Sequence, residues 1–427
     1  MNSIVKTAGR EGRRFWDHFL VYLKWFGLAL FLGAILGAVA AGFYYCLTYV
    51  TRLRGHYPDI VWFLPLGGLV IAALYRLFDK KSEKEDKGTN MAIAAVNSDE
   101  EIPARTAPLI FLATTLSHLF GASVGREGAA LQMGASIGST IAKAFKFNEN
   151  DKKIMIMTGM SAAFAGIFGA PIAAAIFSME VISVGVMYYA ALVPCIVSAI
   201  TAYYIAHLLG VTYTTFQLGV IPALTPLNAG KAVLLGMLCA VLSIFVCWAL
   251  IGTEKFMQKV FSNPYVRIFV AGTVIALLTL LVGDQTYNGL GIESILAAVA
   301  GRTVWYAFLL KLLFTAISLA GGYRGGEIIP TLFIGATFGC LCASWFHMPP
   351  EICAAVCMVA VFCGVTNSPI ASFVMGLELF GGQGFWLFGI VVAISYMLSD
   401  YYGLYKSQLI IYSKYRSVYV RRQANHR

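Results

Sequence analysis

The stretch AFAGIFGAPIA (residues 163–173) decides the architecture of this chain, because it recurs 198 residues later as VFCGVTNSPIA (residues 361–371). Upstream of it, MGASIG (residues 133–138) matches IGATFG (residues 334–339) at an offset of 201 residues. Two neighbouring matches at nearly equal offsets indicate an internal duplication rather than chance similarity between small-residue helices. We therefore expect two related halves of about 200 residues each.

The composition places both halves in a lipid bilayer. Of 427 residues, 59% are hydrophobic and only 12% are charged, and the mean hydropathy is +0.75. A soluble domain has about 45–50% apolar and about 25% charged residues. A membrane barrel would show short alternating strands, whereas continuous apolar runs such as residues 27–41 occur here. The chain is predicted to be an all-α integral membrane protein.

The net charge of +10 is informative about orientation. Much of the excess lies at the two ends, in Lys6, Arg10, Arg13, Arg14, Lys414, Arg416, Arg421, Arg422 and Arg427. The positive-inside rule then predicts that both termini are cytoplasmic. We expect a multi-pass protein of the plasma (inner) membrane. We expect no signal peptide and no nucleic-acid partner. The nine cysteines lie in apolar runs without zinc-type spacing, so no metal and no cofactor are expected.

The distribution of apolar runs predicts a single transmembrane domain over residues 1–427, with halves at about 16–215 and 225–415. Several apolar stretches are too short to cross about 30 Å of hydrocarbon, and such segments indicate half-helices or re-entrant segments. The polar segment at residues 79–101 is predicted to be a loop, and no appended cytoplasmic domain is expected. Short, interrupted helices at matching places in two halves are typical of transporters whose binding site lies between the repeats.

Ionisable residues open one of these helices. GREG (residues 125–128) puts Arg126 and Glu127 directly before an apolar run. A helix start offers free N–H groups and the positive end of the helix dipole, so Glu127 could be a tethered anion in a site for a mobile one. It could also simply cap its helix, with Arg126 as partner. GGEIIP (residues 325–330) stands at the matching place in the other half, and two facing helix starts would form an anion site from main chain.

The order and spacing of GREG, GGEIIP and Tyr405 resemble the signature segments of the CLC family of chloride channels and anion/proton antiporters. The resemblance implies two inverted-topology repeats with about 18 helices, many short or re-entrant, a homodimer, and no CBS domain in this chain. It also implies that Glu127 is the gating and proton-coupling glutamate and that Tyr405 donates its hydroxyl to the central anion. The residues it implies around the anion are Gly88, Thr89, Asn90, Met91, Gly125, Arg126, Gly128, Glu327, Ile328, Ile329 and Tyr405.

Three departures are informative about the substrate. Chloride-transporting members carry GSGIP where this chain has GTNMA (residues 88–92), an aromatic residue where it has Ile328, and often an internal glutamate where it has Val181. These departures resemble the fluoride/proton antiporter branch, although Ile329 differs from the threonine expected there. The implied function is export of fluoride in exchange for protons. A chloride/proton antiporter or a passive chloride channel is the alternative.

The remaining polar residues in apolar runs are expected to be structural. Glu180 and Glu378, which occupy equivalent places in the two halves, would hold local backbone at helix ends. Lys311 would extend to the membrane surface, and His118 would pack between helices. The glycines of the repeat, Gly134, Gly138, Gly335 and Gly339, would permit close helix packing. A serine protease using Ser123 with His207 as base would explain neither the repeat nor GGEIIP, so no enzymatic activity is expected.

Overall fold

A computed structural model describes residues 2–78, 88–98 and 100–425 of the chain. The first half consists of helices α1 (Asn2–His56), η1 (Pro58–Phe63), α2 (Leu64–Phe78), α3 (Asn90–Asn97), α4 (Thr106–Phe120), α5 (Glu127–Ala144), α6 (Glu149–Phe168), α7 (Pro171–Glu180), η2 (Tyr189–Ala191) and α8 (Leu192–Leu208). A two-residue strand, β1 (Ser183–Val184), follows α7.

The second half repeats this order. It consists of α9 (Pro226–Val260), α10 (Pro264–Val282), α11 (Ile292–Val299), α12 (Ala307–Gly321), α13 (Ile328–Phe346), α14 (Pro350–Thr366), α15 (Pro369–Phe380) and α16 (Phe385–Leu398), followed by strands β2 (Leu409–Tyr412) and β3 (Tyr419–Gln423). The described residues thus contain sixteen α-helices, against the expected eighteen or so. The predicted all-α membrane fold with short helices is confirmed.

One expectation about local structure is wrong. The loop predicted at residues 79–101 contains a helix: residues 79–87 and 99 lie outside the described residues, but residues 90–97 form α3. Residues 92–96 of this helix are buried, so apolar burial stabilises a helix inside a polar segment. Residues 404–412 form a further apolar stretch, which is not helical. It ends in β2, which pairs with β1 in parallel and with β3 antiparallel.

Reciprocal hydrogen bonds relate the two halves. The amide of Ser123 donates to Ser318 Oγ at 2.9 Å, and the amide of Arg324 donates to Ser117 Oγ at 3.1 Å. Ser117 and Ser318 occupy equivalent places in the two halves, as do Ser123 and Arg324. A residue pair that is matched by its own mirror pair is the mark of a two-fold axis. The repeated segments therefore pack about an internal pseudo-two-fold axis, as inverted repeats do.

The matched glutamates form a second reciprocal pair. The Glu180 carboxylate accepts hydrogen bonds from the amides of Ile370 (3.1 Å) and Ala371 (2.8 Å) at the start of α15. Glu378 accepts from Ile172 (3.0 Å) and Ala173 (2.8 Å) at the start of α7. Each glutamate lies near the end of one helix and caps the equivalent helix of the other half. The expectation that they hold backbone is confirmed, and the backbone they hold belongs to the opposite half.

Replacing Glu180 with alanine is expected to destabilise the protein by about 3 kcal/mol, because two amides at the start of α15 lose charged hydrogen-bond partners in a largely buried place. Thermal unfolding in detergent, followed by fluorescence-detected size exclusion, should show a midpoint lower by several degrees. Glu293→Ala, which removes an exposed carboxylate from the first turn of α11, serves as the control. Equal midpoints for the two variants would contradict the capping role.

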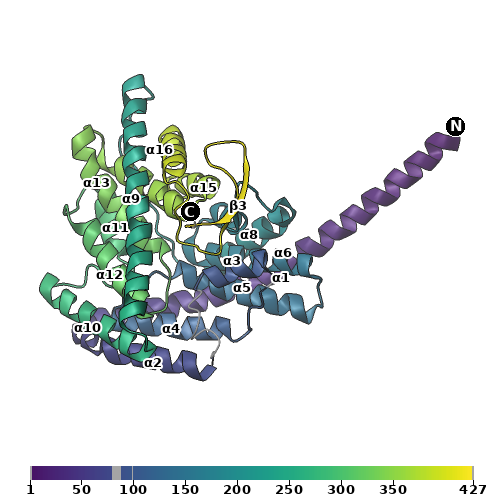
Figure 1. Ribbon diagram of the computed structural model, residues 1–427. Coiled ribbons are helices and arrows are strands. Elements are labelled where there is room, and N and C mark those ends of the chain that lie inside the picture. The colour runs from purple at the N-terminus through teal and green to yellow at the C-terminus, as the bar shows by residue number, and fades with distance from the viewer. Residues whose placement is uncertain (1, 79–87, 99, 426–427) are drawn as a thin grey trace.

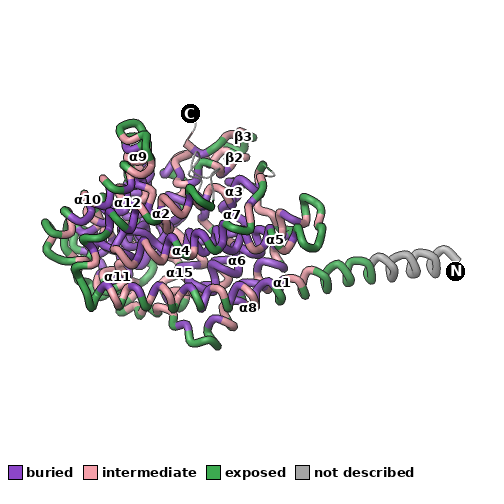
Figure 2. Tube along the Cα trace, turned by 90° about the horizontal axis from the view of Figure 1, so that it is seen from below, coloured by how far each residue is buried: buried purple, intermediate pink, exposed green. Residues whose placement is uncertain are grey.

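Six helices in the described residues are long and apolar enough to span a membrane, among them α9, α10 and α13. The N-terminal part of α1, a helix of 55 residues, projects away from the helical body (Figure 1). The buried residues gather where α5, α6 and α7 cross the middle of the molecule, and green exposed positions lie at its rim (Figure 2).

The glycines of the repeat lie at close helix contacts, as expected. A Cβ atom added at Gly335 would lie 2.6 Å from the Cys357 carbonyl oxygen of α14. Added side chains at Gly134 and Gly138 would collide with the backbone of Gly159 and Met155 on α6. Since small residues let helix backbones approach each other in membranes, α5 and α13 can pack directly on α6 and α14. This packing holds the starts of α5 and α13 near the centre of the molecule.

Candidate anion site

The two signature segments meet in an isolated antiparallel bridge. The amide of Gly125 donates to the Gly326 carbonyl at 2.5 Å, and the amide of Gly326 donates to the Gly125 carbonyl at 2.7 Å. No side chain fits here, because a Cβ atom at Gly125 would lie 2.9 Å from the Gly326 oxygen. Helix α5 begins shortly after Gly125, and α13 begins shortly after Gly326. The bridge therefore fixes the two helix starts beside each other at the pseudo-two-fold axis.

Glu127 occupies the start of α5 and is fully buried. Its carboxylate accepts hydrogen bonds from the backbone amide of Arg126 at 3.1 Å and from Arg126 Nε at 3.3 Å. The carboxylate thus uses the free N–H of a helix start, which is the group an anion would use there. Glu127 therefore caps its helix with Arg126 as its partner, and it does so at the kind of helix start where an anion could bind.

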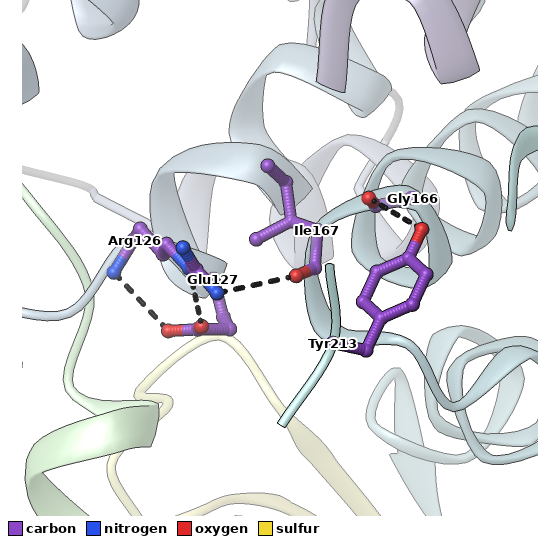
Figure 3. Close-up of polar contacts among 5 residues, drawn as sticks. All are labelled: Arg126, Glu127, Gly166, Ile167 and Tyr213. Carbon is purple, nitrogen blue, oxygen red and sulfur yellow. Dashed lines mark hydrogen bonds and ion pairs between the residues drawn. The ribbon is translucent and has the colours of Figure 1, made fainter. Parts of the chain in front are cut away.

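Three neighbours orient the Arg126 side chain. Its guanidinium pairs with Glu127, donates to the Ile167 carbonyl at 3.4 Å and lies 5.4 Å from the centre of the Tyr44 ring. Figure 3 shows the pair beside Tyr213, whose hydroxyl donates to the Gly166 carbonyl at 3.1 Å. Tyr213 was not singled out from the sequence, because it lies in a loop that no motif marks.

A small cavity of about 40 Å³ adjoins this carboxylate. It is lined by Arg126, Glu127, Phe168, Tyr213, Thr214, Phe216, Ile292, Ile295, Ile329, Leu332, Met358 and Leu379. We call it the outer cavity. Its volume suits a water-sized ion. Ile328 and Ile329 are both buried in the core cluster that includes Phe333 and Tyr405, and of the two only Ile329 lines the outer cavity.

A second carboxylate, Glu327, lies at the start of α13 among hydroxyl groups. The hydroxyls of Tyr405 and Thr89 both lie next to it, yet neither hydroxyl has a hydrogen bond of normal geometry. Both hydroxyl-bearing residues are buried, with exposed fractions of 1% for Tyr405 and 3% for Thr89. Buried hydroxyls normally find partners, and the acceptor that lies beside these two donors is the Glu327 carboxylate.

The residues of the GTNMA segment (residues 88–92) make different contacts. Thr89 reaches the bridge, since its Oγ1 lies 3.1 Å from the position of a Cβ atom at Gly128. Asn90 lines the same cavity as Glu327, and its Oδ1 accepts the amide of Ser407 at 3.0 Å. Met91 packs against the hydrophobic core, and Gly88 has a positive φ of 43°, which glycine adopts without strain. Among these four residues, Thr89 is the one that faces Glu327.

Tyr405 is held in place by amide side chains that the sequence motifs do not mark. Gln408 is fully buried and donates to the Val181 carbonyl (3.0 Å) and the Thr366 carbonyl (2.9 Å). Asn97 of α3 donates to the Ser407 carbonyl at 3.1 Å. These bonds attach the chain around Tyr405 to both α3 and the α14–α15 junction. The sequence did carry a signal for Gln408: a neutral amide side chain within an apolar stretch has to find hydrogen-bond partners when it is buried.

A larger cavity of about 250 Å³ opens on the Glu327 side. We call it the inner cavity, because it lies on the side of the C-terminal segment. Its lining includes Thr89, Gln132, Arg267, Arg324, Glu327 and Lys406. Gln132 was also missed from the sequence, although it stands one turn after Gly128 and donates to its carbonyl at 3.2 Å. The outer cavity adjoins Glu127 at the start of α5, and the inner cavity adjoins Glu327 at the start of α13. The Gly125–Gly326 bridge joins these two helix starts.

Two other sequence candidates have different surroundings. Ser123 Oγ shares a hydrogen bond with Thr315 Oγ1 at 3.0 Å, while the His207 ring stacks on Tyr203, so no serine–histidine pair forms. Lys311 does not extend to the membrane surface as expected. It is fully buried and donates to the Tyr287 and Gly289 carbonyls, because loop carbonyls inside the membrane need donors.

One known protein family matches most of this chain. The family described as voltage gated chloride channel matches residues 67–400. The chain belongs to the CLC family. The resemblance deduced from the signature segments is thereby confirmed, and the match places the chain in a family of membrane channels and transporters.

Individual relatives refine the comparison. A chloride/fluoride channel protein of Pseudomonas syringae pv. tomato is 34% identical over 399 residues, which cover 92% of this chain and 88% of the relative. The crystal structure of a CLC-type fluoride/proton antiporter superposes with a TM-score of 0.87 and 31% identity, covering 91% of this chain and 98% of that structure. A slow cyanobacterial Cl⁻/H⁺ antiporter shares the fold, with a TM-score of 0.74, 18% identity and coverage of 88% and 94%. This chain is therefore a multi-pass CLC membrane protein.

Proposed function

We propose that this CLC protein is a fluoride/proton antiporter that exports fluoride from the cytoplasm while protons move inward. The observation that carries the proposal is the Glu127 carboxylate on the free amide of Arg126 at the start of α5. An ionised carboxylate there competes with a mobile anion for the same donor. A protonated one binds the donor weakly, leaves it and takes a proton along. One group then ties the two movements together.

The inner half of the path supports the preference for fluoride. Fluoride is small and strongly hydrated, so its dehydration requires strong donors at short range. The Thr89 and Tyr405 hydroxyls, which have no hydrogen bond of normal geometry, supply two such donors, and hydrogen bonds to an ionised acceptor are shorter and stronger than neutral ones. The relatives described as a chloride/fluoride channel protein and as a fluoride/proton antiporter support the same substrate.

The Glu327 carboxylate adds a second titratable group on this path. It comes from the other half of the chain and lies beside the Thr89 and Tyr405 hydroxyls. We propose that it alternates with fluoride for these hydroxyls, as Glu127 alternates with fluoride at the outer helix start. The protein would work as a homodimer in the plasma membrane with both termini cytoplasmic. The inner cavity would then face the cytoplasm, where fluoride is collected.

Paired anion efflux tests the substrate. Purified protein in liposomes loaded with either fluoride or chloride is expected to release fluoride at least about tenfold faster, a barrier difference of about 1.4 kcal/mol. Ion-selective electrodes measure both rates, and an imposed proton gradient should drive fluoride uphill. Protein-free liposomes are the control. Equal efflux of the two anions would assign the chain to the chloride/proton antiporters, and chloride flow without proton movement would make it a passive chloride channel.

A further inference from the structure

A buried lysine holds the loop between α10 and α11. Lys311 of α12 has no exposed surface, and its Nζ donates to the Gly289 carbonyl at 2.7 Å and to the Tyr287 carbonyl at 3.2 Å. The ammonium group also lies 5.3 Å from the centre of the Phe333 ring of α13. A single side chain therefore joins this loop to α12 and α13.

The same loop is bonded to the chain just before the Glu127 segment. Asn288 Nδ2 donates to the Gly121 carbonyl at 2.7 Å, and the amide of Gly289 donates to the Ala122 carbonyl at 3.1 Å. Ala122 lies five residues before Glu127 in the sequence. Hydrogen bonds thus connect the α10–α11 loop to the segment at residues 121–127, and Lys311 holds the loop in place.

Arg54 closes this unit from the other side. Its guanidinium donates to the His118 carbonyl at the end of α4 and lies against Gly289, where an added Cβ atom would come within 2.9 Å of Nη2. Gly289 also has a φ of 57°, so its backbone and its surroundings both require glycine. Lys311 thus gives two loop carbonyls donors that lipid cannot provide, and Arg54 does the same for the His118 carbonyl beside the loop.

The loop leads directly into a wall of the outer cavity. Helix α11 begins at Ile292, and Ile292 and Ile295 line the outer cavity together with Glu127 and Ile329. Helix α11 is also the counterpart of α3 in the other half, since α10, α11 and α12 repeat the order of α2, α3 and α4. The start of α3 carries Thr89 to the inner side of the bridge. The start of α11 takes the equivalent place on the outer side.

We propose that Lys311 is a positioning residue for coupled transport: by fastening the α10–α11 loop it keeps the start of α11 against Glu127, so that fluoride passes outward only when this carboxylate moves. The inference rests on the proposed function. A lysine that merely stabilised the fold would change the amount of active protein but not the number of protons exchanged per fluoride. The ratio of protons to fluoride therefore distinguishes the two roles.

The first test measures that ratio in liposomes for wild type, Lys311→Met, Lys311→Arg and the exposed-lysine control Lys259→Met. Methionine keeps the length but removes the donors, so we expect partial loss of coupling, with more fluoride leaving per proton. Arginine keeps donors and is expected to restore the wild-type ratio. An unchanged ratio in Lys311→Met would overturn the proposal. If wild type itself moved no protons, the proposed function would fail instead.

The second test does not depend on transport. Hydrogen exchange of the purified protein, followed by mass spectrometry, should show roughly tenfold faster exchange in Lys311→Met at residues 286–292 and 121–127, since a lost buried hydrogen bond eases local opening by about that factor. Exchange in the distant helix α8 should stay unchanged, which excludes general unfolding. Equal protection of the two segments in wild type and Lys311→Met would show that the lysine does not fasten them, and would overturn the proposal.

Discussion

Glu127→Gln is expected to abolish proton coupling and to lower fluoride turnover by roughly 100-fold or more, a loss of about 2.7 kcal/mol. Glutamine keeps the size of the side chain but can neither carry a proton nor compete as an anion for the Arg126 amide. Fluoride efflux and proton uptake, recorded together in liposomes, provide the measurement.

The matched control is Glu149→Gln, which neutralises a carboxylate that is 62% exposed at the start of α6. It should transport like wild type. Continued proton-driven fluoride export by Glu127→Gln would refute the mechanism, because the carboxylate would then not be the coupling group.

Glu327→Gln is expected to have the second-largest effect, a decrease in fluoride turnover of about tenfold or more, which corresponds to about 1.4 kcal/mol. The amide is always neutral and always offers N–H donors, so it cannot alternate between binding the Tyr405 and Thr89 hydroxyls and releasing them. The initial rate of fluoride efflux from liposomes, at matched amounts of folded protein, measures the loss.

Thr89→Ala and Tyr405→Phe complete this second test, since each removes one of the hydroxyls beside Glu327. If the hydroxyls and the carboxylate act as one unit, each hydroxyl variant combined with Glu327→Gln should lose less than the separate losses would predict. Fully additive losses would separate Glu327 from the hydroxyls and contradict the proposed inner site.

Much of the architecture could be predicted from the sequence because membrane helices satisfy their own backbone hydrogen bonds. Apolar runs therefore indicated helices, and the matched segments at residues 163–173 and 361–371 indicated two halves. Helix α3 was missed, because the start of a short helix inside a polar segment depends on burial against other elements. The strand β2 was missed for the same reason, since its partner β1 lies in the other half of the chain.

The candidate site shows the same division. Glu127 was marked because an acid at the start of an apolar helix requires an explanation, and the resemblance to the CLC segments marked Glu327 and Tyr405. The motifs could not separate Thr89, which faces Glu327, from Asn90, which bonds to Ser407. Lys311 was misassigned, since a lysine in an apolar helix extends to the surface unless nearby carbonyls accept its protons. Those carbonyls belong to the loop before α11, and only folding brings that loop to the lysine.

The sequence by itself determined the membrane location, the duplication and the carboxylate at a helix start, because these follow from composition and from repeated local patterns. The tertiary structure alone decided which groups meet. The bridge between Gly125 and Gly326 joins the two halves of the chain. The hydroxyls of Thr89 and Tyr405, which belong to different halves of the chain, both lie beside Glu327. Such contacts depend on how the two halves pack about their axis, and packing across that distance leaves no local pattern in the sequence.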